Sequence, residues 1–203
     1  GSEEMDCKKV GQLILKLRNE KGLTQKQVAD SLNISNKTVS KWECGMGCPD
    51  VTLWTELSEV LGADILKLLE GELKPNKPDI GKIEKVKFYV CPSCNNILIS
   101  TGEATISCCG RKLAMLKPAS KHDEHEVTIQ EIDMQHFISI NHPMTKEHYI
   151  LFIAYVQNER VLLHRLYPEQ NAEINLPMMR SRGNLYIYCT EHGLMKYPFK
   201  AKR

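Results

Sequence analysis

The C-terminal third of the chain carries a set of metal-binding side chains that any fold of this region has to bring together. Four of them are histidines and one is a cysteine: His125, His142, His148, Cys189 and His192. Structural zinc sites are usually closed by four protein ligands, several of them cysteines. Five ligands with four imidazoles instead favour a metal of higher coordination number, with a sixth position open to water or substrate. We therefore expect iron in a redox role.

The spacing of these residues limits how the chain can run. His142 and His148 are six residues apart, which on an extended strand would separate them by roughly 20 Å, at about 3.3 Å per residue. Both reach one ion only if the chain doubles back, and Pro143 with the polar residues 145–147 permits that turn. The segment Cys189-Thr-Glu-His192 enters a glycine loop, so sulfur and imidazole can approach one ion from a compact turn.

A second group of ligands precedes the first and consists of four cysteines: Cys91, Cys94, Cys108 and Cys109. A CxxC turn brings two thiolates onto one ion, and four thiolates this close together predict a metal site. The vicinal pair is unusual, because neighbours on a strand point to opposite faces. Both can bind one ion only if the backbone turns there, which Gly110 would favour. So short a segment takes its folding energy from the metal, whether the role is structural or redox.

The cysteines and the apolar segments of the sequence indicate where the protein is located. Eight cysteines and an opening sequence, GSEEMDCKKV, without an apolar signal-peptide core argue for reduced thiols and a cytoplasmic location. No stretch approaches the roughly 20 apolar residues of a membrane span, so we expect no membrane contact. Three cysteines lie apart from the clusters. The spacing of Cys44 and Cys48 permits a metal or a disulfide switch, but with no further ligand nearby we expect them and Cys7 to be ordinary thiols.

Residues 8–70 show the apolar periodicity of helices. Thr24, followed three residues later by Gln27, has the pattern of a capping box. Ser35 is a second N-cap, ahead of the sequence NKTVSKWE. Two short helices joined through residues 32–34 are what a helix-turn-helix requires.

The segment LTQKQVADSLNISNKTVSKWECG resembles the helix-turn-helix core of the Cro/C1 (XRE) repressor family, and PDVTLWTELSEVLGADILKLLEGE resembles its last two helices. The resemblance implies a five-helix DNA-binding domain over residues 8–72 and a double-stranded DNA operator as partner. It also implies a homodimer, because two half-sites lie about 34 Å apart. The core would include Val28, Ala29, Val39 and Trp42.

The same resemblance places particular side chains at the DNA. Gln25 would contact a backbone phosphate. Four others would face the major groove: Asn36, Lys37, Ser40 and Lys41. Lysine suits guanine and asparagine suits adenine, so these residue types fit base readout. The alternative is a protein-interaction bundle, with Lys37 and Lys41 as solvated charges.

Residues 73–84, KPNKPDIGKIEK, have the prolines and charges of a linker. Beyond it, CPSC and CCGRKLAML resemble desulforedoxin, an iron–tetrathiolate module, so we expect a small metal ribbon over residues 85–117. A Cys₄ site takes zinc as readily as iron. Short runs rich in β-branched and aromatic residues follow from residue 126: 127–129, 137–140, 149–156, 161–166, 172–176 and 184–188. They predict an antiparallel, immunoglobulin-like β-sandwich over residues 118–203, which makes the chain multidomain, α and β.

HPMTKEHYI together with CTEHGL resembles the catalytic domain of superoxide reductases, and residues 85–200 together resemble a two-centre desulfoferrodoxin. The resemblance implies two mononuclear iron sites and an electron donor such as a rubredoxin-like protein. Cys189 would be the axial ligand, opposite an open position where superoxide is reduced to hydrogen peroxide. The equatorial plane would be formed by His125, His142, His148 and His192.

Two histidines are candidates for the first histidine ligand. His122 competes with His125, and we prefer His125 because Ile129, four residues later, matches the family's apolar strand residue. We expect His122, and likewise His136 and His164, to be surface or packing histidines.

The family usually has Glu-Lys before the first histidine, whereas this chain has Asp123-Glu124. A lysine there would attract superoxide and stabilise the peroxide product. Glu124 reverses that charge, and Lys121 and Lys146 are candidate replacements. The sequence thus supports three hypotheses: a superoxide reductase with a DNA-binding domain, a regulator whose iron senses superoxide or oxygen, and a repressor with a merely structural metal domain.

Overall fold

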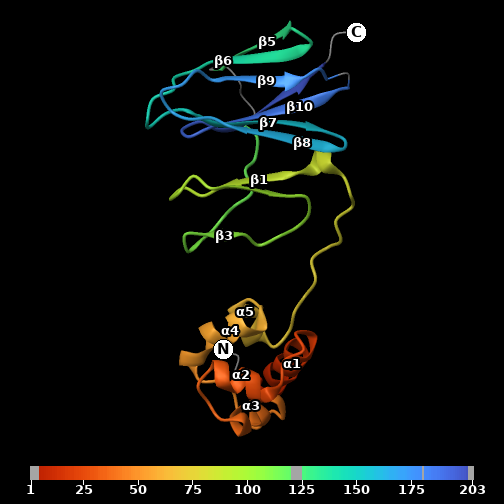
Figure 1. Ribbon diagram of the computed structural model, residues 1–203, viewed down its shortest axis with the longest axis vertical. Helices are drawn as coiled ribbons and strands as arrows, with labels where there is room; N and C mark the ends of the chain where they lie inside the picture. Colours follow the sequence, from red (N-terminus) through yellow and green to blue (C-terminus); the bar gives the residue numbers. More distant parts are fainter. Residues whose placement is uncertain (1–4, 120–124, 180, 201–203) are drawn as a thin grey trace. The chain divides into compact units, whose positions relative to one another are not determined.

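The chain forms two compact units, Gly1–Pro75 and Asn76–Arg203, in a computed structural model that describes residues 5–119, 125–179 and 181–200. Figure 1 shows helices in the first unit and strands in the second. Each unit has its own hydrophobic core. In the described ranges no helix has both the length and the apolar character needed to cross a membrane.

The first unit contains the five helices that the sequence predicts. They are α1 (Cys7–Glu20), α2 (Gln25–Ser31), α3 (Asn36–Glu43), α4 (Trp54–Leu61) and α5 (Ile65–Glu70), with a 3-10 turn at Val51–Leu53. Side-chain caps set their starts: Thr24 and Gln27 form the capping box of α2, and Ser35 caps α3. Gly62 and Gly71 end α4 and α5 in the left-handed conformation that glycine adopts without strain.

Helix α1 packs directly on α3. The closest approach is at Gly11, where an added Cβ would lie 1.8 Å from the carbonyl oxygen of Trp42. Arg18 of α1 donates from Nε and Nη2 to the two carboxylate oxygens of Glu43, and this ion pair is nearly buried. The four residues expected in the core are buried: Val28, Ala29, Val39 and Trp42.

The expectation of unpaired thiols in this unit is wrong for two of the three cysteines. Cys7, the first residue of α1, is disulfide-bonded to Cys48, 41 positions later, with their Cα atoms 5.0 Å apart. Cys44 is unpaired and exposed. The local spacing of Cys44 and Cys48 was the wrong guide, because disulfide pairing depends on proximity in the fold.

The second unit is built around two antiparallel sheets, as predicted. One has the order β11 (Gly193–Phe199), β10 (Gly183–Cys189), β7 (Ile150–Gln157) and β8 (Arg160–Arg165). The other has the order β5 (Glu126–Ile132), β6 (Gln135–Asn141) and β9 (Glu173–Pro177). Their facing side chains form one core that includes Ile138, Ile153, Tyr155 and Leu185.

Strand β11 was not among the predicted strands. Its sequence contains Pro198, which has no N–H to donate and therefore weakens a strand pattern. The structure tolerates the proline because β11 lies at the edge of its sheet, paired only with β10.

The four-cysteine ribbon lies before the sandwich in sequence and packs on it. It consists of β1 (Lys87–Val90) paired with β2 (Ile97–Ser100), and β3 (Ser107–Cys108) paired with β4 (Arg111–Lys112), after a 3-10 turn at Ile83–Lys85. The ring of Phe88 lies 5.4 Å from that of Phe152 and 5.2 Å from that of Tyr186, centroid to centroid. Ribbon and sandwich therefore share an apolar contact within one unit.

Replacing Gly11 with alanine should destabilise the first unit by about 2 kcal/mol. Alanine in a helix interior would gain about 1 kcal/mol over glycine. Overpacking typically costs about 1–3 kcal/mol, and we expect the upper end of this range because the added Cβ would lie 1.8 Å from the carbonyl oxygen of Trp42. Urea unfolding followed by fluorescence measures this unit alone, because the two tryptophans of the chain, Trp42 and Trp54, both lie in it. Gly47→Ala is the control, since an added Cβ there meets nothing within 4 Å; equal stability of both variants would contradict the packing argument.

Candidate metal centres

The four cysteines of the ribbon converge on one point. One ligand atom from each of Cys91, Cys94, Cys108 and Cys109 lies within 4.8 Å of the others. The vicinal pair achieves this through a two-residue hairpin, in which Cys109 and Gly110 have φ values of 51° and 72°. Positive φ at both central residues is the geometry of a type I′ turn. The turn that this pair requires is therefore present, and glycine occupies its second position.

The protonation of these thiols shows that the cluster suits a cation. Burial raises the pKa of Cys91, but hydrogen bonds from the backbone N–H groups of Ser93 and Cys94, together with those from the thiols of Cys94 and Cys108, outweigh it and lower this pKa to about 6. In contrast, the neighbouring sulfurs of Cys94, Cys91 and Cys108 raise the pKa of Cys109 to about 12. Four thiolates this close repel one another. Full ionisation therefore needs a bound positive ion, and a tetrathiolate donor set fits iron or zinc.

The histidines and the cysteine of the sandwich also converge. His125, His142, Cys189 and His192 each offer a ligand atom within 4.8 Å of the others. The Sγ atom of Cys189 lies 3.3 Å from Nε2 of His142 and 3.5 Å from Nδ1 of His192, which in turn lies 3.2 Å from Nε2 of His125. Three imidazoles and one sulfur thus surround a single point.

The fifth predicted ligand, His148, lies beside this group but is not within the same 4.8 Å set. Its ring centroid is 4.6 Å from that of His142 and 4.7 Å from that of His192. It shares a second set with His192 and Glu191. Nε2 of His148 is buried and has no hydrogen-bond partner among the described residues. A buried nitrogen without a partner is costly, and a metal ion would satisfy it.

Contacts on the outer ring nitrogens orient these imidazoles. Nδ1 of His142 hydrogen-bonds to the carbonyl oxygen of Pro143, and Nδ1 of His148 lies 3.5 Å from Oε2 of Glu191. Each contact leaves Nε2 for the centre, the arrangement usual around metal-bound histidine. Sequence reasoning missed both contacts, although Glu191 stands inside the CTEHGL segment that drew attention to its neighbours.

Strand pairing and one threonine hold the two ligand segments together. Cys189 is fully buried at the end of β10, where the register against β7 shifts in a bulge between Tyr188 and Cys189. Thr190 donates its backbone N–H to the carbonyl of Tyr149, and its hydroxyl donates to the carbonyl of Glu147 while accepting from the Tyr149 N–H. The loop that carries His148 is thereby fixed to the loop that carries Cys189.

Burial favours the neutral form of two of the imidazoles, His125 and His142. Burial, followed by the neighbouring His142, His192 and His148, lowers the pKa of His125 to about 4. Burial also lowers the pKa of His142. Neutral imidazole is the ligand form, so the donor set fits a divalent iron ion.

The remaining sequence candidates lie elsewhere or cannot be placed. His122, Glu124 and Lys121 fall outside the described residues. His136 is buried, with its ring 5.0 Å from Phe199 in an edge-on contact, and so packs in the sandwich. His164 lies on β8, away from both metal-ligand groups.

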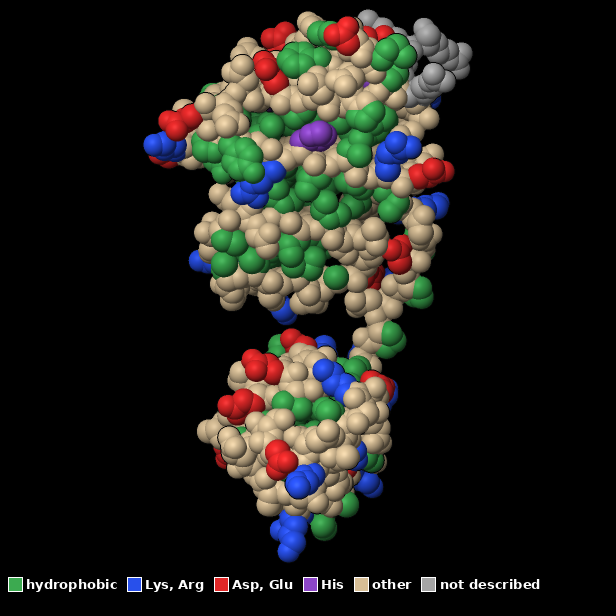
Figure 2. Space-filling view, viewed as in Figure 1, with side chains coloured by type: hydrophobic (Ala, Val, Ile, Leu, Met, Phe, Trp, Pro, Cys, Tyr) green, Lys and Arg blue, Asp and Glu red, His purple; other side chains and the backbone are tan. Residues whose placement is uncertain are grey.

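Four of the five residues predicted to contact DNA lie on α3. Asn36, Lys37 and Lys41 are exposed, and Ser40 is half-buried. Figure 2 shows basic side chains projecting from the helical unit at the end where Figure 1 places α3. Gln25 begins α2 and donates from Nε2 to the carboxylate of Glu43, so its amide is oriented from within the unit.

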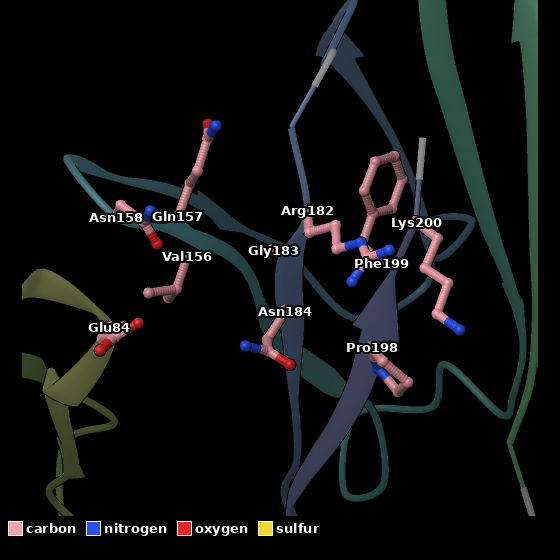
Figure 3. Close-up of a pocket in the computed structure, with 10 residues that line it drawn as sticks. All are labelled: Glu84, Val156, Gln157, Asn158, Arg182, Gly183, Asn184, Pro198, Phe199 and Lys200. Atoms are coloured by element: carbon pink, nitrogen blue, oxygen red, sulfur yellow. The ribbon is translucent and has the colours of Figure 1, made fainter. Parts of the chain in front are cut away.

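A hollow of about 290 Å³ lies elsewhere on the second unit. Figure 3 shows Glu84 on one side of it and Arg182 and Lys200 on the other. None of its lining residues belongs to the metal-ligand groups.

Comparison with known proteins separates the chain into the same two parts. Residues 14–68 match the Helix-turn-helix family. The HTH-type transcriptional activator BcrR of Enterococcus faecalis is 41% identical over 56 residues, 28% of each chain. The desulfoferrodoxin of Syntrophotalea carbinolica is 28% identical over 120 residues, covering 55% of this chain and 94% of that protein. The superoxide reductase of Treponema pallidum, a solved structure, aligns with a TM-score of 0.47 at 16% identity, over 55% of this chain and 96% of that one.

These similarities define the class of protein. The N-terminal part is a helix-turn-helix domain of the XRE type, and the C-terminal part is homologous to desulfoferrodoxins. The chain is a fusion of the two.

Replacing Glu191 with alanine should weaken iron binding by about 10- to 100-fold, the usual effect of removing a group that orients a metal-bound histidine. The carboxylate beside Nδ1 of His148 would be lost. The measurement is a competition titration of ferrous iron against a chelator under anaerobic conditions. Glu147→Ala removes the same charge next to the same histidine, but only the backbone carbonyl of Glu147 makes a contact in the described residues. Equal affinities of the two variants would show that Glu191 does not orient His148.

Proposed function

We propose that the second unit reduces superoxide to hydrogen peroxide at a non-haem iron. The ligands would be one thiolate and four imidazoles: Cys189, His125, His142, His148 and His192. The observation that carries the proposal is the convergence of His125, His142, Cys189 and His192, together with the unpartnered Nε2 of His148 beside them. Iron bound there would supply one electron to superoxide, and two protons would complete the peroxide.

The burial of the ligands would determine the side from which superoxide approaches the iron. Cys189 is fully buried, whereas His192 is exposed, so the solvent-facing side of the cluster lies away from the sulfur. A small anion would enter from that side. Lys146, exposed in the loop between His142 and His148, would attract it electrostatically.

The four-cysteine ribbon would serve as the relay for electrons. It packs on the sandwich through Phe88, and Asn95, which follows Cys94, donates to the hydroxyl of Tyr149. The backbone N–H of Tyr149 donates a hydrogen bond to the hydroxyl of Thr190, the residue after Cys189. The proposed donor is a small redox protein of the rubredoxin kind, although a direct transfer to the histidine site is the alternative.

The activity is tested on anaerobically prepared, iron-loaded protein. It should consume superoxide at least about tenfold faster than a Cys189→Ser variant, because the thiolate donates electron density to the iron. The control is Cys44→Ser, which removes an exposed thiol of the first unit and should leave the rate unchanged. Equally slow reaction of wild type and Cys189→Ser, or zinc at the histidine site after purification, would end the enzymatic proposal.

A second candidate function follows from the helix-turn-helix domain on the same chain. We propose that a homodimer binds a double-stranded operator through α3 and that the redox state of the iron biases its affinity. Asn36, Lys37, Ser40 and Lys41 would read bases and Gln25 would contact a phosphate. This regulator needs little turnover, and both functions can coexist in one chain.

The DNA proposal is tested with a duplex selected by the full chain from a random pool. Lys41→Ala should weaken binding by about 1–3 kcal/mol, the range for a lost base contact. Lys67→Ala, which removes a half-buried lysine of α5 paired with Glu70, is the matched control. Gel shifts of reduced and oxidised protein should give different affinities; identical affinities would remove the sensor, and an unaffected Lys41→Ala would remove α3 as the reading helix.

A further inference from the structure

The disulfide between Cys7 and Cys48 belongs to neither metal centre. Cys7 begins α1, and Cys48 lies in the segment that leaves α3 and leads to α4. Both side chains are half-buried. The bond therefore ties the first helix of the DNA-binding unit to the segment directly behind its proposed reading helix.

Noncovalent contacts hold these two segments together independently of the bond. A Cβ on Gly45 would lie 3.1 Å from the Cα of Lys8, so the turn after α3 already touches the first turn of α1. Further along α1, Gly11 touches Trp42 and Arg18 pairs with Glu43. Two thiols at positions 7 and 48 would thus remain neighbours after reduction. A pair that stays close in both states can open and close repeatedly.

Cys44 supplies an internal comparison. It is the C-cap of α3, exposed and unpaired, and only four residues from Cys48. A thiol this accessible would compete for oxidation if exposure alone decided the outcome. The fold instead places Cys48 against Cys7.

We propose that Cys7 and Cys48 form a thiol–disulfide site for a hydroperoxide, by which hydrogen peroxide stabilises the DNA-binding unit. The inference rests on the proposed function only for the source of the peroxide, which would be superoxide reduced on the same chain. The redox state of this cysteine pair would then depend on how much superoxide the chain has reduced. No contact between the iron site and the helix-turn-helix is needed, because the peroxide diffuses.

The chemistry balances with peroxide as the two-electron oxidant. One thiolate attacks a peroxide oxygen, an S–O bond forms as the O–O bond breaks, and one water leaves after protonation. The second thiol then attacks the resulting sulfenic sulfur, an S–S bond forms as the S–O bond breaks, and a second water leaves. In total two thiols and one hydrogen peroxide give one disulfide and two waters.

Closing this bond should stabilise the helical unit. A cross-link over 41 positions removes conformational freedom from the unfolded chain. For a unit of this size the melting temperature should rise by about 10 °C or more on oxidation. Fluorescence of Trp42 and Trp54 reports that transition within the intact protein.

The first experiment adds hydrogen peroxide to the reduced full chain under anaerobic conditions. Peptide mapping after alkylation should show the Cys7–Cys48 bond, and the tryptophan melting transition should move up. Cys44→Ser should behave like the wild type, whereas Cys7→Ser and Cys48→Ser should both lose the shift. Alkylated Cys7 and Cys48 after peroxide, a Cys44–Cys48 bond in their place, or a bond without a change in melting temperature would each overturn the proposal. If Cys7→Ser does not fold, the mapping and melting of wild type and Cys44→Ser still decide.

The second experiment tests the thiol site and the proposed superoxide reduction independently of each other. Superoxide in place of peroxide should form the bond faster in the iron-loaded wild type than in Cys189→Ser, where only the spontaneous dismutation of superoxide supplies peroxide, whereas added peroxide should form it at the same rate in both. Bond formation by peroxide, with equal rates in the two proteins when superoxide is supplied, would support the thiol site and count against the proposed superoxide reduction. No bond with either reagent would overturn the thiol site, whatever the rate of superoxide consumption.

Discussion

The pairing of β7 with β10 is the interaction on which the second unit depends. It lies at the centre of the four-stranded sheet. The sequence of β7, ILFIAYVQ, is almost continuously apolar, as expected for a strand that is covered on both faces. Ile153 faces the core between the sheets, and Phe152 belongs to the cluster that contains Phe88 of the ribbon. The same pairing ends at Cys189, so this one strand pairing positions the ribbon, the sulfur of Cys189 and the loop that Thr190 attaches to it.

Much of this arrangement could be predicted from the sequence, because its signals are local. The capping box at Thr24, the CxxC turn and the apolar run of β7 each depend on neighbouring residues. A turn at Cys109 could also be predicted, since two adjacent cysteines reach one ion only around a turn; its type I′ geometry is seen only in the structure. The sequence predicted which residues would be ligand candidates better than how their rings would be oriented.

What could not be predicted depends on long-range proximity. Strand β11 is acceptable only because it is an edge, and an edge is a property of the sheet. The Cys7–Cys48 bond spans α1, α2 and α3, so only their packing reveals it. Glu191 stands beside a predicted ligand, yet its partner is His148 on another loop. In each case the local pattern was visible and the partner was not.

A buried histidine nitrogen without a hydrogen-bond partner is not by itself evidence of a metal ligand. Two histidines of the second unit show why. His148 Nε2 and His136 Nδ1 are both buried without a hydrogen-bond partner among the described residues, and each would carry a desolvation cost of about 1–3 kcal/mol. His136 stands against Phe199 and the Met179 carbonyl and belongs to no group of metal ligands among the described residues. His148 stands among further imidazoles, with a carboxylate on its outer nitrogen. Only convergence of donors turns an unpaired nitrogen into a metal site, because a cation then lowers the cost for all of them at once.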